Sequence, residues 1–416
     1  MSTLSLPAPR LPTPRRRTAA LLAMAVGAFG IGTGEFVIMG LLPNVAGSLH
    51  VSIPSAGHLI SAYALGVVVG APTLIAASTR MTRKSLLITL MIAFAIGNVL
   101  SAVASDYDWL LAARFASGLP HGAYFGVASV VAGGLVEPAR RTRAMSMMFA
   151  GLTVANIVGV PLSTMLGQHV GWRPVFVVVG VIGVLAAAAV WIAVPAKYVS
   201  TAPLHLRSEL TALGRRTVWL ACATAMIGGA SLFATYSYIT PMVTNITGYA
   251  QSSVTPLLVL VGIGMTVGNL VGARLVDRAL MPSLYAFLAL DAVIAAVFML
   301  ALHNKIATAV TLMVFAATTF ALVPALQTRI IQGAGDAPNI ASGANQAAFN
   351  IANALGAWLG GIVIAAGFGY NAPNLVASGL AIAGLLIAIV SGRERPAAPT
   401  PPEPVEHEVR EEVAVG

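Results

Sequence analysis

The chain has 416 residues, of which 57% are apolar and 9% are charged, and its mean hydropathy is +0.86. A soluble domain carries about 25% charged residues, so this composition excludes a water-soluble globule and indicates an integral membrane protein. The single cysteine, Cys222, excludes a disulfide framework and a thiolate metal cluster. The sequence contains neither an H-E-x-x-H metal motif nor a G-x-x-x-x-G-K-[ST] nucleotide-binding loop.

Long apolar stretches recur along the chain. A hydrocarbon core of about 30 Å needs roughly 20 apolar residues per helix, and twelve such stretches are present. They are rich in Ala, Gly, Leu and Val rather than alternating in polarity, which favours helices over a membrane barrel. In chain order, the expected spans are 18–42, 56–78, 85–104, 109–134, 143–167, 173–195, 217–240, 253–275, 282–302, 306–328, 340–366 and 371–391.

The basic residues are distributed unevenly between the predicted loops. Twenty of the 23 lysines and arginines fall on one side of the membrane, Arg173 and Lys305 fall on the other, and Arg114 lies within a span. Because basic loops remain in the cytoplasm, we expect both termini to be cytoplasmic. This placement accounts for the net charge of +9 without nucleic acid. We expect a multi-pass protein of a prokaryotic inner membrane.

The order of the spans divides the chain into two six-helix units. We expect a basic N-terminal tail (1–17), a first half (18–195), a cytoplasmic linker (196–216), a second half (217–392) and a Pro-rich acidic tail (393–416). Both tails have compositions typical of disordered segments.

An internal repeat supports this division. A shift of 198 residues superposes glycines and prolines in several spans, and a shift of 197 superposes Ala155-Asn156 on Ala352-Asn353. The matched pairs at 198 are Gly30 and Gly228, Pro43 and Pro241, Ser55 and Ser253, Gly66 and Gly264, Gly70 and Gly268, and Arg80 and Arg278. The expected fold is therefore all-α, with twelve transmembrane helices in two pseudo-symmetric halves related by an axis along the membrane normal.

Three segments resemble one transporter family. They are GTGEFVIMGLLP (32–43), RFASGLPHG (114–122) and TVANIVGVPL (153–162). All three are similar to the drug:proton antiporter group of the major facilitator superfamily, in the branch of arabinose-efflux permeases and chloramphenicol exporters. The resemblance covers about residues 18–392 and implies the major facilitator fold.

The family signature between the second and third spans, G-x-L-a-D-R-x-G-R-K, is only partly present. Thr79 stands where the family has aspartate, and Ile75 where it has glycine. The resemblance implies a cytoplasmic gate formed by Arg80, Arg83, Lys84, Asp277 and Arg278.

Two further family patterns lie in the fourth and fifth spans. Arg114 and Gly118 match R-x-x-x-G, and Gly159 and Pro161 stand where the family has the Gly-Pro pair of its antiporter motif. Val160 separates that pair here. The resemblance nevertheless implies export by proton antiport.

Three charged residues lie well inside predicted spans: Glu35, Arg114 and Asp291. A charge at the bilayer centre costs roughly 2.5–3.5 kcal/mol, so each must face a cavity, have a partner or become neutral. We interpret Glu35 as a group for proton coupling or for recognition of a cationic substrate. We interpret Arg114 as a fixed positive charge that biases a nearby carboxylate or binds an anionic group, His121 as a proton relay, and Asp291 as a further candidate for proton coupling. The alternatives are a structural hydrogen bond for Glu35, snorkelling for Arg114, simple packing for His121, and for Asp291 a bond to a neighbouring helix rather than proton coupling.

Other polar and aromatic residues are predicted to line a substrate cavity. Amides and hydroxyls at helical spacing point into a membrane bundle because lipid does not solvate them, although bonds between helices are an equal alternative. The candidates are Phe36, Met39, Tyr63, Tyr124, Phe125, Asn156, Ser163, Phe233, Tyr236, Tyr238, Phe315, Gln346, Phe349, Asn350 and Asn353.

These features predict a proton-coupled antiporter that exports small lipophilic compounds, such as antibiotics, by alternating access. The alternative is an exporter of a sugar, a nucleoside or another polar metabolite. A membrane receptor or enzyme is more remote, because neither a soluble domain nor clustered catalytic residues are apparent. We expect no cofactor beyond the proton gradient, no nucleotide or nucleic-acid partner, and a monomer that contacts a small-molecule substrate, protons and lipid.

Overall fold

The computed structural model describes residues 13–78, 80–137, 140–195, 215–334 and 338–394, and all regular structure within these ranges is helical. The first half comprises α1 (Pro14–Leu49), α2 (Ile53–Ala77), α3 (Arg83–Ala102), α4 (Tyr107–Gly134), α5 (Arg141–Val154), the π-turn η2 (Ala155–Gly159), α6 (Val160–Val170) and α7 (Trp172–Ala193). The second half comprises α9 (Arg216–Tyr236), α10 (Ile239–Asn245), the 3₁₀ turn η4 (Gln251–Ser253), α11 (Val254–Arg278), α12 (Leu280–Ala301), α13 (Lys305–Ala334), α14 (Pro338–Ala365) and α15 (Ala372–Arg393).

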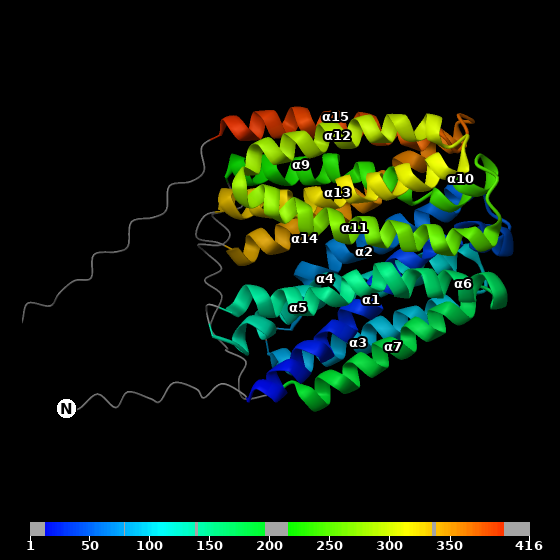
Figure 1. The fold of residues 1–416 in the computed structure, drawn as a ribbon. Coiled ribbons are helices and arrows are strands. Elements are labelled where there is room, and N and C mark those ends of the chain that lie inside the picture. Colours follow the sequence, from blue (N-terminus) through cyan, green and yellow to red (C-terminus); the bar gives the residue numbers. More distant parts are fainter. Residues whose placement is uncertain (1–12, 79, 138–139, 196–214, 335–337, 395–416) are drawn as a thin grey trace, which may run out of the picture.

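The helices form one bundle of nearly parallel rods. Figure 1 shows α3 and α7 along one edge and α12 and α15 along the other, while α2 packs against α14 where the halves meet. The outer helices expose large apolar side chains, among them Ile96, Leu185, Leu300 and Leu386. An apolar exterior on a helical bundle fits a lipid environment, because a helix satisfies most of its backbone hydrogen bonds without water.

Eleven of the described helical stretches are long and apolar enough to cross a membrane. The remaining span, α4, has 28 residues, which is about 42 Å of helix. Its interior carries Arg114, Pro120 and His121, and these residues lower its hydropathy. The twelve predicted spans therefore correspond to twelve rods of the bundle.

Three spans differ in detail from the expectation. The first helix begins at Pro14, so residues 14–17 are helical rather than part of the tail. The fifth span contains the π-turn η2, because Pro161 has no N–H to continue the α-helical pattern. The seventh span is broken between α9 and α10, shortly before Pro241. Several predicted features lie wholly or partly outside the described residues. They are residues 196–214 of the predicted linker (196–216), residues 1–12 and 395–416 of the predicted tails (1–17 and 393–416), and Thr79.

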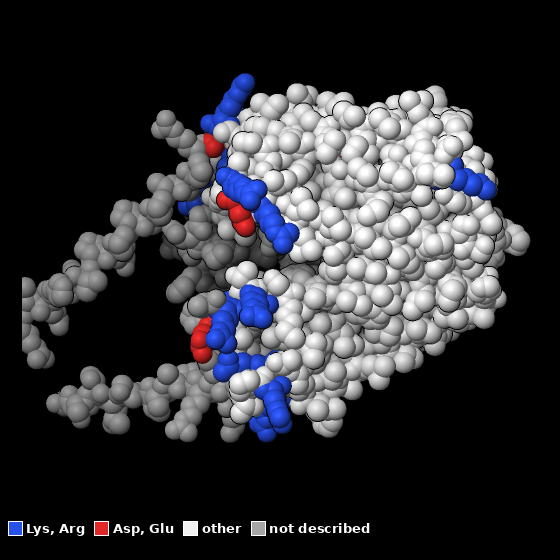
Figure 2. All heavy atoms as spheres, in the orientation of Figure 1, with Lys and Arg blue, Asp and Glu red and all other residues white. Residues whose placement is uncertain are grey.

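The two ends of the bundle differ in charge. We name the basic end as the one where α1 begins and α15 ends, and the opposite end as the one that holds the α1–α2 connection. Figure 2 shows basic side chains gathered at the basic end in two groups with an indentation between them. The uneven distribution of Lys and Arg that the sequence predicts is therefore present on the folded surface.

Glycines allow a close approach between α2 and α4 in the first half. Gly66 and Gly70 of α2 face the backbone carbonyls of Phe115 and Leu119 on α4, and a Cβ atom at either glycine would overlap these oxygens. The small-x-x-x-small pair therefore sets the separation of α2 and α4.

The second half repeats this contact at the predicted offset. Gly264 and Gly268 of α11 face the carbonyls of Met313 and Ala317 on α13, and a Cβ atom would again overlap them. All four residues lie 198 positions after their counterparts, so the repeat in the sequence corresponds to a repeated helix contact.

We predict that Gly268→Ala lowers the free energy of unfolding by about 1–3 kcal/mol, because the new methyl group overlaps a backbone that cannot move independently. Gly70→Ala should do the same in the first half. Thermal unfolding in detergent can be followed through the reaction of the buried thiol of Cys222 with a dye.

Gly126→Ala on α4 is the matched control, since its Cβ would lie 3.7 Å from the Ile75 Cδ1 atom, an ordinary contact. Equal unfolding temperatures for Gly268→Ala and Gly126→Ala would show that the close approach does not limit stability.

Candidate functional site

Glu35 lies where the two halves meet. Its side chain is only 3% exposed, and the Nδ2 atom of Asn353 on α14 donates a hydrogen bond to its Oε1 atom at 3.0 Å. Gly32 and Gly34 flank the carboxyl and allow α5 and α7 to pack closely against α1. The bond joins residues 318 positions apart, one from each half.

Arg114 is fully buried on α4 and has unusual surroundings. Its Cζ atom lies 4.4 Å from the ring centroid of Tyr63 and 5.4 Å from that of Phe176, so two aromatic faces contact the guanidinium. Among the described residues, its three side-chain nitrogens have no hydrogen-bond partner. Glu35 is near enough to interact electrostatically but not to form an ion pair. The guanidinium of Arg114 is therefore enclosed by aromatic side chains inside the first half.

His121 links three helices. The Tyr63 hydroxyl lies 3.2 Å from its Nδ1 atom, and the Nε2 atom of Gln346 lies 3.3 Å from its Nε2 atom. The imidazole therefore lies between a hydroxyl of α2 and an amide of α14. Helix α14 contacts the first half through both Gln346 and Asn353.

An aromatic cluster lies beside Glu35. Phe36 of α1 stacks on Phe233 of α9 at 6.5 Å and contacts Tyr236 at 6.3 Å. Phe233 makes an edge-to-face contact with Phe349 of α14 at 5.1 Å. Four of the residues predicted to line a cavity are thus brought together from three helices and both halves.

The buried asparagines present hydrogen-bond acceptors. Asn156 and Asn350 each donate from Nδ2 to a carbonyl of their own helix, that of Leu152 at 3.1 Å and that of Gln346 at 3.0 Å. These bonds fix the orientation of both amides. Their Oδ1 atoms, and that of Asn353, have no partner among the described residues.

Two predicted cavity tyrosines instead serve helix packing. The Tyr124 hydroxyl donates to the carbonyl of Met24 at 2.8 Å and ties α4 to α1. The Tyr238 hydroxyl donates to the carbonyl of Ala357 at 2.7 Å within the second half.

Three apolar candidates also lie outside the aromatic cluster. Phe315 stacks on Phe298 of α12 at 6.4 Å, so it packs toward the edge of the second half. Phe125 stacks on Phe149 of α5 at 5.2 Å, and Met39 is fully buried in the core. The sequence identified these side chains as interior but did not specify their neighbours.

The π-turn changes which face of the fifth span is polar. We expected Asn156 and Ser163 to share a face at i and i+7, as in a regular α-helix. The π-turn Ala155–Gly159 adds a residue to that turn. As a result, Thr164 is fully buried, whereas Ser163 is only half-buried.

The two residues of the antiporter motif have different structural roles. Gly159 faces Thr33 and Phe29 of α1, where a Cβ atom would overlap the threonine hydroxyl. Pro161 begins α6 directly after the π-turn. The motif therefore fixes how the fifth span packs against the helix that carries Glu35.

Asp291 lies apart from this site. It is fully buried on α12, and Thr319 of α13 donates a hydrogen bond to its Oδ1 atom at 2.9 Å. The contact ties two helices of the second half, as in the alternative given for this residue.

Within the described part of the chain, the residues expected at the gate do not pair across the two halves. Lys84 donates to the carbonyl of Trp191 at 2.6 Å within the first half. Arg80, Asp277 and Arg278 are exposed, and Arg83 is half-buried. None of the five predicted gate residues forms an ion pair with another described residue.

A fourth buried charge was missed. Arg329 of α13 donates from Nε to the Ser391 hydroxyl of α15 at 3.1 Å, and from Nη2 to the Ser391 carbonyl. Its position near a predicted span end indicated a loop residue, whereas the structure uses it to join two helices.

Comparisons with known proteins agree with this fold. The family model described as Major Facilitator Superfamily matches residues 24–344. The inner membrane transport protein YdhP of Escherichia coli K12 is 43% identical over 376 residues, which is 90% of this chain and 96% of that protein. A chloramphenicol resistance protein of Streptomyces lividans is 34% identical over 375 residues, which is 89% of this chain and 93% of that protein.

A solved structure shows the same fold at low sequence identity. It is a bacterial homolog of the human lysosomal transporter Spinster, in an inward-facing and occupied conformation, with a TM-score of 0.74 and 16% identity. The likeness covers 94% of this chain and all of that one. The chain is a multi-pass membrane protein that belongs to the major facilitator superfamily of transporters.

Proposed function

We propose that this protein is a proton-coupled antiporter that exports small compounds by alternating access, with Glu35 as its proton-carrying group. The observation that carries the proposal is the 3.0 Å hydrogen bond from Asn353 to Glu35 across the two halves. Membership of a transporter family sets aside the receptor and enzyme alternatives.

The bond between Asn353 and Glu35 links protonation to movement. The amide donor stabilises the ionised carboxylate, and it comes from the half that must move during alternating access. When the halves change position, the carboxylate loses this donor and the neutral form becomes more favourable. By linkage, a proton that binds Glu35 then favours the rearranged state. A proton that crosses 100 mV supplies about 2.3 kcal/mol, so the gradient can drive export without another cofactor.

The distribution of charge suggests the orientation. Positive charge at the basic end favours a cytoplasmic location for that end and for both termini. The hydrogen bonds that join the halves cluster between the middle of the bundle and the opposite end, among them Ser61 to Ala354 and Thr240 to Met39. With this orientation, the halves are held together at the end away from the cytoplasm, so the described conformation faces inward. We place the protein in a prokaryotic inner membrane, as the name of YdhP indicates for that relative.

The site favours an amphipathic substrate. The aromatic cluster offers an apolar surface, and the free Oδ1 atoms of Asn156, Asn350 and Asn353 can accept bonds from hydroxyl or N–H groups. The relative from Streptomyces lividans is named for chloramphenicol resistance. We therefore propose antibiotics of this kind as substrates.

The alternative is an exporter of a sugar, a nucleoside or another polar metabolite. The same three amide oxygens favour it, because a hydroxyl-rich substrate supplies the donors that they lack. The two readings differ in how strongly transport depends on the aromatic cluster.

We expect Glu35→Gln to abolish proton flux driven by substrate. Glutamine keeps the shape of the side chain and its acceptor oxygen, but it cannot bind and release a proton. Purified protein in liposomes with a trapped pH dye measures this directly. Chloramphenicol, a cationic dye and arabinose are added in turn under an imposed proton gradient.

Asp291→Asn is the matched control and should retain flux, since that carboxyl bonds within the second half. Flux that persists in Glu35→Gln would remove Glu35 from the coupling role. Flux with arabinose alone would favour the metabolite exporter, and no flux with any compound in the wild type would contradict proton antiport.

Phe349→Ala should raise the KM for chloramphenicol by roughly 3- to 10-fold, because the edge-to-face contact with Phe233 and its apolar surface are lost. Tyr124→Phe should leave that KM unchanged and lower the free energy of unfolding by about 1 kcal/mol. Transport assays and thermal unfolding of the two variants separate substrate contact from packing. An unchanged KM in Phe349→Ala would exclude the cluster from the substrate site.

A further inference from the structure

The helix that carries Glu35 contains a proline in its interior. Pro43 has no N–H, so the carbonyl of Met39, four residues earlier, has no donor within its own helix. Inside a membrane such a carbonyl needs a donor from a neighbouring helix. Met39 is fully buried, so lipid and bulk water do not reach it.

Thr240 supplies this donor from the other half. Its Oγ1 atom lies 3.0 Å from the carbonyl oxygen of Met39 and 3.2 Å from that of Gly40. The threonine is fully buried at the start of α10. A single hydroxyl thus replaces the hydrogen bond that Pro43 removes, across the contact between the halves.

The repeat provides an internal comparison. Pro241 is the counterpart of Pro43 at the offset of 198. In the second half, α9 ends at Tyr236 and α10 begins at Ile239, so the helix is broken before the proline. In the first half, α1 runs unbroken through Pro43 to Leu49. The helix that stays continuous at its proline is thus the one that receives the hydrogen bond from Thr240.

We propose that Thr240 is a positioning residue of the transport cycle, whose hydroxyl bond to the Met39 carbonyl stabilises the conformation sealed at the opposite end. The inference rests on the alternating access of the proposed function. The bond requires both halves to be in contact, so it must break when this end opens. Met39 lies one turn after Glu35 on the same helix, so the seal and the proposed coupling group share a rigid segment of α1.

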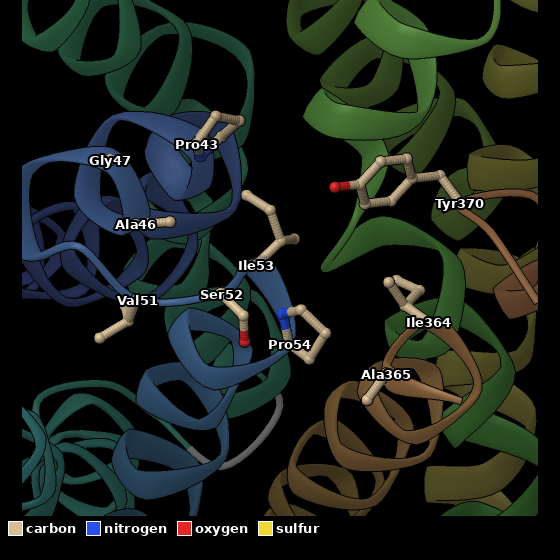
Figure 3. Close-up of a pocket in the computed structure, with 10 residues that line it drawn as sticks. All are labelled: Pro43, Ala46, Gly47, Val51, Ser52, Ile53, Pro54, Ile364, Ala365 and Tyr370. Carbon is tan, nitrogen blue, oxygen red and sulfur yellow. The ribbon is translucent and has the colours of Figure 1, made fainter. Parts of the chain in front are cut away.

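The surroundings of the hydrogen bond between Thr240 and Met39 show where the opposite end would open. Figure 3 shows Pro43 and Ala46 on one side of a depression, with Ile364 and Tyr370 on the other. The depression has a volume of about 690 Å³ and lies between the halves. The carbonyls of Met39 and Gly40, which Thr240 contacts, lie one turn inward from Pro43 along α1.

The test measures the separation of the halves directly. Spin labels are placed at two exposed positions of the opposite end, Ser48→Cys and Ser252→Cys, in a Cys222→Ser background. Pulsed electron resonance then gives the ratio of open to sealed populations in reconstituted protein. This readout needs neither substrate nor a proton gradient, so it can fail independently of the antiport proposal.

We expect Thr240→Val to raise the open-to-sealed ratio by roughly 2- to 10-fold, the range of one buried hydrogen bond. Thr240→Ser keeps the hydroxyl and should match the wild type. Pro43→Ala restores an N–H to Met39 in both conformations, so it should raise the ratio by a similar factor. In the double variant the two effects should not add, because both remove the same difference between conformations.

Three outcomes would overturn the proposal. One is a wild-type ratio in Thr240→Val, and another is additive effects in the double variant, which would mean that Thr240 does not act through the Met39 carbonyl. The third is a wild-type ratio in Pro43→Ala, which decides the question even if Thr240→Val fails to fold.

Discussion

Buried polar groups in this bundle have no water to bond, so each must find its hydrogen-bond partner within the protein. The rest of the structure depends on this constraint. Many buried hydroxyls and amides meet it locally by donating to a carbonyl one turn earlier, as Thr33 does to Phe29 and Ser101 to Gly97. Such bonds hold the donor group against its own helix, while the side-chain oxygen can still accept a hydrogen bond. The informative atoms are those that local bonding does not satisfy.

Two buried charges of the first half illustrate this. The guanidinium of Arg114 contacts the rings of Tyr63 and Phe176 and has no hydrogen-bond partner among the described residues. The carboxyl of Glu35 takes its donor from α14 of the other half, so this bond forms only when both halves are folded and docked. The energetics of the site therefore depend on the relative position of the halves, which is the quantity that changes in alternating access.

The composition and the spacing of residues were sufficient to predict the architecture. Hydropathy located the spans, and the offset of 198 identified the repeated glycines, because both depend on residues close in sequence or on a pattern that recurs unchanged. Glu35 and Arg114 were predicted as site residues from the high free energy of charged groups in a membrane, and His121 as a proton relay from the titration range of imidazole. Their partners were not, since Asn353 is 318 positions from Glu35 and Phe176 approaches Arg114 only through the packing of α7.

The remaining differences between the predicted and the observed helices arise at prolines. At Pro161 the fifth span inserts a π-turn and rotates Thr164 inward, whereas at Pro43 the first helix continues unbroken and takes a hydrogen bond from Thr240. At Pro241 the helix breaks. Each proline removes the same N–H group, so no rule based on the proline alone distinguishes the three responses. A proline within a predicted span thus indicates that a donor is needed, and the tertiary structure determines which side chain provides it.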